Sequence, residues 1–184
     1  MGGVASRGQL RMAFARWAAV TVPLMLLLGF GSGASVQAGS DSPWYASLAK
    51  PVGTPPDWAF PLAWGVIYVC LGLALAMVMN ARGARGRGAG LAAFAATLVL
   101  TALWMPVFFG AHRVDLAIAI ALGMVALGTV TAVLFGRVRN GAAWLMVPFL
   151  AWVSYAAALT WGIDRLNPGA GDLAPVAAAT QVIG

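Results

Sequence analysis

Five long apolar runs dominate the sequence, and they decide what the chain can fold into. None carries Asp, Glu, Lys or Arg in its interior, and they cover about residues 17–33, 61–80, 90–109, 116–135 and 142–163. Most are near the ~20 residues that a helix needs to cross ~30 Å of hydrocarbon. A helix satisfies its own backbone hydrogen bonds in lipid, and the two-residue alternation of a membrane barrel is absent. The sequence therefore predicts an all-α integral membrane protein, a bundle of five transmembrane helices.

Composition supports the same class. The chain is 61% hydrophobic and 9% charged, whereas soluble domains carry about 25% charged residues. Its 184 residues suffice for one domain. We expect a basic N-terminal segment over residues 1–16, the membrane domain over 17–168 and a flexible C-terminal tail over 169–184.

The first run has two interpretations. Arg7, Arg11 and Arg16 precede it, and a small residue, Ala38, ends the polar stretch that follows. This pattern is typical of a cleaved secretory signal, but also of a retained first helix. Local features leave both open.

The basic residues predict an orientation. If the N-terminus lies inside, the outer segments carry only Lys50, Arg113 and Arg165. The inner segments then carry eight arginines, at positions 7, 11, 16, 82, 85, 87, 137 and 139. This bias predicts that the N-terminus is inside and the C-terminus outside. The Arg- and Gly-rich stretch over 81–90 is a short inner loop near anionic lipid headgroups, so membrane lipid rather than nucleic acid is the expected partner.

Aromatic residues gather toward the outer ends of three predicted helices. Each helix places two of them three or four positions apart, on one face. The pairs are Trp64 with Tyr68, Trp104 with Phe108, and Trp152 with Tyr155. They can form the wall of a pocket for a flat, apolar, conjugated ligand, or they can be core packing. An interfacial belt explains Trp17, Trp144 and Trp161 better.

Motifs for enzymatic chemistry are mostly missing. The chain has one histidine, His112, and one cysteine, Cys70. We expect His112 to be a solvated loop residue and Cys70 to behave as a small apolar residue. The spans hold no carboxylate for a proton relay, and there is no nucleotide-binding glycine motif. We therefore predict no metal site and no catalytic residue, and the pattern argues against a pump, an ATPase or a standard oxidoreductase.

Three motifs resemble the TspO/MBR family, the tryptophan-rich sensory or translocator proteins. Residues 44–68, WYASLAKPVGTPPDWAFPLAWGVIY, are similar to that family's WYxxLxKPxWxPPxWxFxxxWxxxY. Residues 102–113, ALWMPVFFGAHR, resemble NxxWxPxFFG, the end of that family's third helix, and residues 147–168 resemble PYLxWxxFxxxLNxxxWxLN. The resemblance covers roughly residues 40–168, with five helices in order, and it implies that the first helix is retained.

The resemblance also implies a function. Family members bind porphyrins and other tetrapyrroles, some bind sterols or synthetic aromatic compounds, and some bacterial members promote light-dependent breakdown of protoporphyrin. It implies that this chain binds a porphyrin- or haem-like ligand, requires no cofactor, and acts in transport, sensing or regulation of that ligand. The alternatives are an enzyme that degrades porphyrin with light and oxygen, and a structural membrane protein. Carried over residue by residue, the ligand site comprises Trp58, Trp64, Tyr68, Trp104, Phe108, Phe109, Trp152 and Tyr155.

The sequence departs from the family pattern at three positions. Gly53 replaces the loop tryptophan of KPxWxPP, which we expect to loosen the loop. Thr101 and Thr160 replace two asparagines, which removes amide donors.

Prolines and small residues add two expectations. Pro106 and Pro148 are expected to kink the third and fifth helices from within. A ridge of small residues on the third helix predicts a homodimer, although the same ridge could pack within one monomer. It consists of Ala89, Ala93, Thr97 and Thr101.

Overall fold

The computed structural model describes residues 7–34 and 36–172, and this part of the chain contains helices and no strand. Five helical segments are long and apolar enough to cross a membrane. They are Gly8–Gly33, Ala59–Asn80, Arg87–Gly110, Val114–Val138 and Asn140–Leu166. Each contains one predicted run, so the predicted five-helix membrane bundle is confirmed.

The elements follow the order of the runs, with short helices between them. The long helices are α1 (Arg7–Gly33), α3 (Ala59–Asn80), α4 (Arg87–Met105), α5 (Val114–Val138) and α7 (Val147–Leu166). The short elements are η1 (Gly39–Asp41), α2 (Pro43–Ser47), the π-helical turn η2 (Pro106–Gly110), α6 (Asn140–Trp144) and η3 (Ala170–Asp172). Much of the expected basic segment 1–16 is therefore the first part of α1. Most of the expected tail lies outside the described residues.

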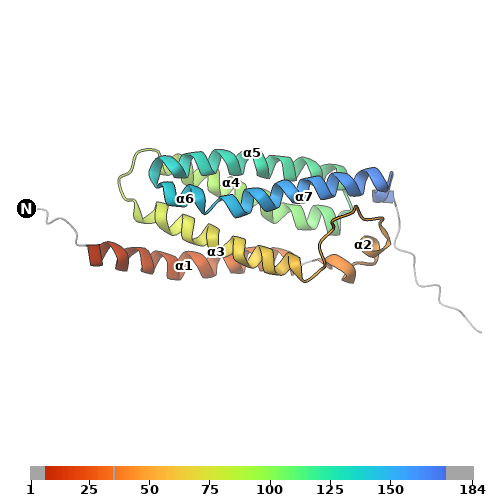
Figure 1. Ribbon diagram of the computed structural model, residues 1–184, viewed down its shortest axis with the longest axis horizontal. Coiled ribbons are helices and arrows are strands. Elements are labelled where there is room, and N and C mark those ends of the chain that lie inside the picture. Colours follow the sequence, from red (N-terminus) through yellow and green to blue (C-terminus); the bar gives the residue numbers. More distant parts are fainter. Residues whose placement is uncertain (1–6, 35, 173–184) are drawn as a thin grey trace, which may run out of the picture.

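The long helices run side by side (Figure 1). Helix α1 packs chiefly along α3, while α4 packs against α5 and α5 against α7. The connection between α1 and α3, here called the cover and defined as residues 36–58, contains η1 and α2. It lies at the end of the bundle where α7 finishes (Figure 1). The turns from α3 to α4 and from α5 to α6 lie at the opposite end.

The two prolines shape their helices differently. Pro106 ends α4 and opens the π-helical turn η2, so the third span does change geometry at this residue. Pro148 does not lie in the interior of a helix and kinks none from within, contrary to the prediction. A turn at Leu145 and Met146 divides the fifth span into α6 and α7, and Pro148 occupies the first turn of α7. The lack of a backbone N–H on Pro148 costs little there, because an N–H in the first turn has no hydrogen-bond partner inside the helix.

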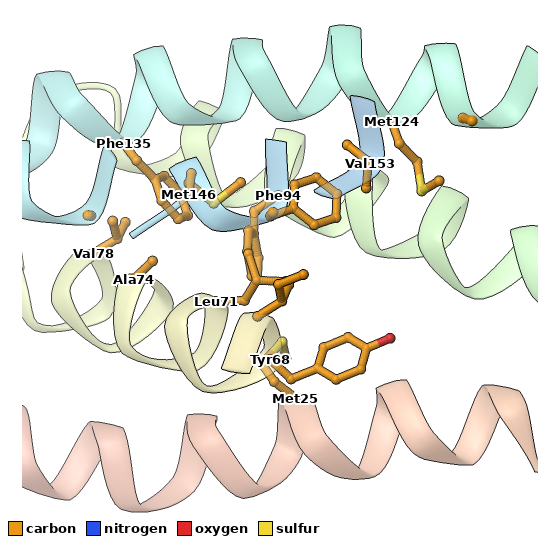
Figure 2. Close-up of a cluster of buried hydrophobic side chains, with 14 of the residues drawn as sticks. Met25, Tyr68, Leu71, Ala74, Val78, Phe94, Met124, Phe135, Met146 and Val153 are labelled. Carbon is orange, nitrogen blue, oxygen red and sulfur yellow. The ribbon is translucent and has the colours of Figure 1, made fainter. Parts of the chain in front are cut away.

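The core lies between α3, α4, α5 and α7. Phe94 of α4 stacks on Phe135 of α5, with ring centroids 5.3 Å apart. Leu71 of α3 and Phe149 of α7 are fully buried in the same cluster, part of which Figure 2 shows. At the edge of this cluster the ring of Tyr68 extends from α3 toward α1, with its hydroxyl pointing away from the other side chains (Figure 2).

The small-residue ridge of the third span packs partly within the monomer. Thr97 is 1% exposed, and its hydroxyl lies 3.1 Å from that of Thr131 on α5. Thr101 is buried as well. These two residues therefore follow the alternative interpretation, in which the ridge contacts a helix of the same chain.

Candidate ligand cavity

A cavity of about 400 Å³ lies beneath the cover, between α1, α3, α4 and α7. Aromatic rings from α3 and from the end of α4 form much of its wall, while Ala156, Leu159 and Thr160 of α7 contribute smaller side chains. The surface is mostly apolar. Size and lining fit the usual range for small-molecule sites, about 300–1,000 Å³.

Five of the eight predicted site residues line this cavity, namely Trp64, Tyr68, Trp104, Phe108 and Phe109. They include two stacked pairs. The rings of Trp64 and Tyr68 lie 5.3 Å apart with planes at 23°, and those of Trp104 and Phe108 lie 5.0 Å apart at 10°. Both pairs arise from helical i, i+4 spacing, which places the side chains one above the other on one face.

The other three predicted residues do not line the cavity. Trp58 is 68% exposed at the start of α3. Trp152 packs edge-on against Phe60, with ring centroids 5.7 Å apart. The hydroxyl of Tyr155 donates a hydrogen bond to the carbonyl oxygen of Gly53 in the cover. Trp152 and Tyr155 thus support the wall and the cover from behind.

Three aromatic residues of the cavity were missed by sequence reasoning: Phe30, Tyr45 and Phe60. Tyr45 belongs to α2. Ser42 caps the start of this helix, because its hydroxyl accepts a hydrogen bond from the Tyr45 backbone N–H at 3.3 Å. Ser followed by Pro is a helix-start signal, and it could have placed Tyr45 on a short helix beside the first span. Phe30 carried no such signal, since it lies in the run assigned to a plain span.

The cover is tied to the bundle by side chains from distant parts of the chain. Trp44 is 1% exposed, and its indole N–H donates to the carbonyl oxygen of Ala170 at 2.8 Å. Asn167, which follows α7, both donates to and accepts from the backbone of Ala49, each at 2.8 Å. The cover is therefore held near its middle by groups that follow the last span.

His112 differs from its prediction as a solvated residue. It is half-buried, with its ring parallel to that of Trp44, 4.3 Å between centroids and 12° between planes. Its φ of 55° is unusual for a residue with a side chain. The stack explains why the imidazole remains at the bundle.

The cover is also held at Gly53, where the sequence departs from the family pattern. Gly53 has φ of 95°, in a turn closed by the N–H of Thr54 and the carbonyl of Pro51 at 3.2 Å. That backbone favours glycine, and its carbonyl receives the Tyr155 hydroxyl. The missing tryptophan does remove a ring, but this part of the loop is anchored rather than loose.

The two threonines that replace asparagines both face the cavity. Their hydroxyls donate to carbonyls of their own helices, Thr101 to Thr97 at 2.9 Å and Thr160 to Ala156 at 2.8 Å. They therefore offer acceptor oxygens to the cavity. The indole N–H of Trp104 is buried and has no hydrogen-bond partner within residues 7–34 and 36–172. A buried donor without a partner is costly, so an acceptor on a bound molecule would stabilise it.

The polar groups at the mouth are acidic. Asp41 and Asp57 both line the cavity, and both are exposed to solvent. Burial raises the pKa of the nearby Tyr45 hydroxyl, and the carboxylate of Asp57 raises it further. Tyr45 therefore stays protonated at neutral pH. The described residues contain no group of three His, Cys, Asp or Glu side chains arranged to hold a metal ion.

Comparison with known proteins identifies the family of this chain. A sequence model of the TspO/MBR family matches residues 19–166. The tryptophan-rich sensory protein of Cereibacter sphaeroides is 39% identical over 124 residues, 67% of this chain and 77% of that protein. Protein CrtK of Rhodobacter capsulatus is 34% identical over 139 residues, 75% of this chain and 87% of that protein. The human translocator protein is 31% identical over 144 residues, 77% and 85% of the two chains.

Proposed function

This chain belongs to the TspO/MBR family, and from that premise we propose that it binds a flat aromatic ligand of the tetrapyrrole kind in the cavity beneath the cover. The observation that carries the proposal is the pair of aromatic stacks, Trp64 with Tyr68 and Trp104 with Phe108, that line one cavity. Large aromatic faces give a planar ring system wide contact and offset stacking. Porphyrin and haem are the ligands to test first, with sterols as a comparison.

Transport or sensing of the ligand is the proposed role. The relatives carry the names sensory protein and translocator protein. The cover is anchored to the bundle, and it closes a cavity that is largely apolar. Such a site suits a molecule that dissolves in the bilayer and is held there, since most wall residues offer apolar contact area. We therefore propose binding without chemistry as the primary activity.

An orientation follows from the charges. The arginines of the α3–α4 turn and of the α5–α6 connection lie at the end of the bundle where α1 begins (Figure 1). We propose that this end is inside, by the excess of basic residues. The cavity and its cover would then open toward the outer side of the membrane.

The test is titration of the purified protein with protoporphyrin in the dark and without oxygen. Bound porphyrin should quench tryptophan fluorescence, because its absorption overlaps indole emission. Trp64→Ala and Trp104→Ala each remove a cavity wall, and we expect a loss of ~2 kcal/mol, about thirtyfold in affinity. The matched control is Trp144→Ala, since Trp144 is 74% exposed on α6 at the opposite end.

Trp152→Ala adds a second comparison. Because Trp152 packs behind Phe60 rather than on the cavity, its loss should weaken binding less than the loss of Trp64. Parent-like affinity in both Trp64→Ala and Trp104→Ala, with folding verified by circular dichroism, would rule out this cavity. A new absorbance product that appears only with light and oxygen would instead support the enzymatic alternative.

A further inference from the structure

A second cavity, here called the side cavity, adjoins the ligand cavity next to α1. Its volume is about 220 Å³, and it lies between α1 and α4. Three residues, Gly29, Tyr68 and Thr101, line both cavities, so the two spaces meet at these side chains. The other residues of the side cavity are Met25, Leu28, Ser32, Leu98, Val99 and Ala102.

The side cavity differs from the ligand cavity in its lining and in what it faces. Among the described residues only Tyr68 brings an aromatic ring to it, and most of its wall is aliphatic. Leu28 of α1 and Val99 of α4 are 53% and 57% exposed on the membrane-spanning surface, so the space is open to lipid. A flexible hydrocarbon chain fits such a space, because it supplies the dispersion contacts that an unfilled gap lacks.

Tyr68 stands between the two cavities with a hydroxyl that has no partner. The residue is 6% exposed, and its hydroxyl makes no hydrogen bond within residues 7–34 and 36–172. The hydroxyl points away from the core side chains (Figure 2). Tyr68 follows Ala59, the first residue of α3, by nine positions, about 13 Å along the helix axis. It therefore lies within the hydrocarbon layer, where lipid chains offer no hydrogen-bond partner.

We propose that the side cavity holds a hydrocarbon chain of the ligand, so that the preferred ligand is a tetrapyrrole with one side-chain carboxyl esterified by a long hydrocarbon alcohol. The inference rests on the proposed function. The ring occupies the ligand cavity, the ester carbonyl accepts a hydrogen bond from the Tyr68 hydroxyl, and the chain lies between α1 and α4. Protoporphyrin binds the same ligand cavity but leaves the side cavity unfilled. A phospholipid tail leaves the Tyr68 hydroxyl unpartnered, because its own ester carbonyl stays near the headgroup level.

The experiment uses protoporphyrin, its monomethyl ester and its mono-octyl ester. Dissociation constants are measured in the dark for the parent and for the double variant Leu28→Phe, Val99→Phe, whose larger side chains narrow the side cavity and do not line the ligand cavity. The matched control is Leu27→Phe with Leu103→Phe, two exposed residues of the same helices that line neither cavity. The quantity compared is the ratio of the methyl-ester constant to the octyl-ester constant. Detergent takes up each porphyrin equally whichever variant is present, so a change in this ratio reports on the protein.

For the parent we expect the octyl ester to bind about tenfold more tightly than the methyl ester. In the double variant this ratio should fall about fivefold, and in the control it should stay at the parent's value. The hydroxyl is tested with an analogue that has a chain of the same length but no ester. The parent should prefer the octyl ester over this analogue about fivefold, and Tyr68→Phe should lose that preference.

The two proposals fail in different ways. If protoporphyrin binds the parent but the double variant keeps the parent's ratio, the chain site is overturned and the ligand cavity remains a porphyrin site. A parent ratio near one has the same meaning. If none of the three porphyrins binds the parent, both proposals are overturned.

Two further outcomes are decisive. A preference for the ester that survives in Tyr68→Phe overturns the assignment of its hydroxyl as the donor. Should the double variant fail to fold, as judged by circular dichroism, Leu28→Phe is compared with Leu27→Phe, its neighbour on α1. About half of the change in free energy is then expected, and equal ratios in these two variants overturn the chain site.

Discussion

The hydroxyl of Tyr155 donates a hydrogen bond to the carbonyl oxygen of Gly53, and this contact joins α7 to the cover. It connects a helix that forms one wall of the cavity with the loop that closes it. The two residues are 102 positions apart in the sequence.

Removing the hydroxyl should loosen the cover without changing the wall. Tyr155→Phe keeps the ring that packs beside Trp152 and deletes only the donor. An exposed hydrogen bond of this kind contributes about 1 kcal/mol, so we expect hydrogen exchange in residues 49–57 and porphyrin dissociation to be about fivefold faster. Tyr68→Phe is the control for exchange, since the Tyr68 hydroxyl makes no hydrogen bond to the cover, residues 36–58. Parent-like exchange in Tyr155→Phe would contradict the prediction.

Asn167 should matter more than its position after the last span suggests. Its amide makes both hydrogen bonds to Ala49 and a third, at 2.7 Å, to the carbonyl of Ile163. Asn167→Ala removes all three and should destabilise the cover and the end of α7 by ~2 kcal/mol, measured by thermal unfolding in detergent. Asn140→Ala, at the opposite end of the bundle, is the comparison and should shift the midpoint little. Equal midpoints for the two variants would show that this amide does not hold the cover.

Gly29 allows the Tyr68 ring to lie against α1. A Cβ at Gly29 would be 2.0 Å from Cε2 of that ring, so Gly29→Ala must displace Tyr68 or separate α1 from α3. We expect a loss of ~1–3 kcal/mol in stability, as for overpacking, and weaker porphyrin binding. Gly31→Ala is a closely matched control, because a Cβ there meets nothing within 4 Å. If Gly29→Ala is as stable and binds as well as Gly31→Ala, the contact is unimportant.

We propose that the homodimer forms through the outer face of α4. Thr97 and Thr101 face inward, but Ala92 and Ala96 are exposed on another face of α4 and keep the four-residue spacing of small residues. Ala92→Leu with Ala96→Leu should shift dimer to monomer in light scattering, with circular dichroism unchanged. Thr97→Leu should instead lower the melting temperature, since its side chain contacts α5. Dimer content that survives the double leucine variant would exclude this face.

The five spans could be predicted because each depends on local composition. A helix that crosses lipid needs a long uncharged run, and such a run can be recognised without knowing which helices pack beside it. The ends of the helices could not be predicted as well. Helix α1 already begins at Arg7 and includes Arg11 and Arg16, which precede the apolar run. Likewise, Pro148 was compatible with a kink or with a new helix start, and only the turn at Leu145 decides between them.

The candidate site shows a similar division. Spacing within one helix correctly joined Trp64 to Tyr68 and Trp104 to Phe108, because i, i+4 neighbours share a face in any helix. Trp152 precedes the cavity residues Ala156 and Thr160 at the same spacing, yet its indole turns toward Phe60. Periodicity gives the face of a helix but not the direction of a long side chain, which depends on the packing around it. Tyr45 was missed because it lies outside the spans.

The hydrogen bond between Trp44 and Ala170 has a consequence for biosynthesis. The two residues are separated by 126 positions, with four of the five spans between them. During translation Trp44 is made early, and its indole N–H can donate to the Ala170 carbonyl only after the last span has been made. The cavity is thus covered only after the last span has been made, and a nascent chain arrested before Ala170 would display an open, aromatic-lined site to the surrounding lipid.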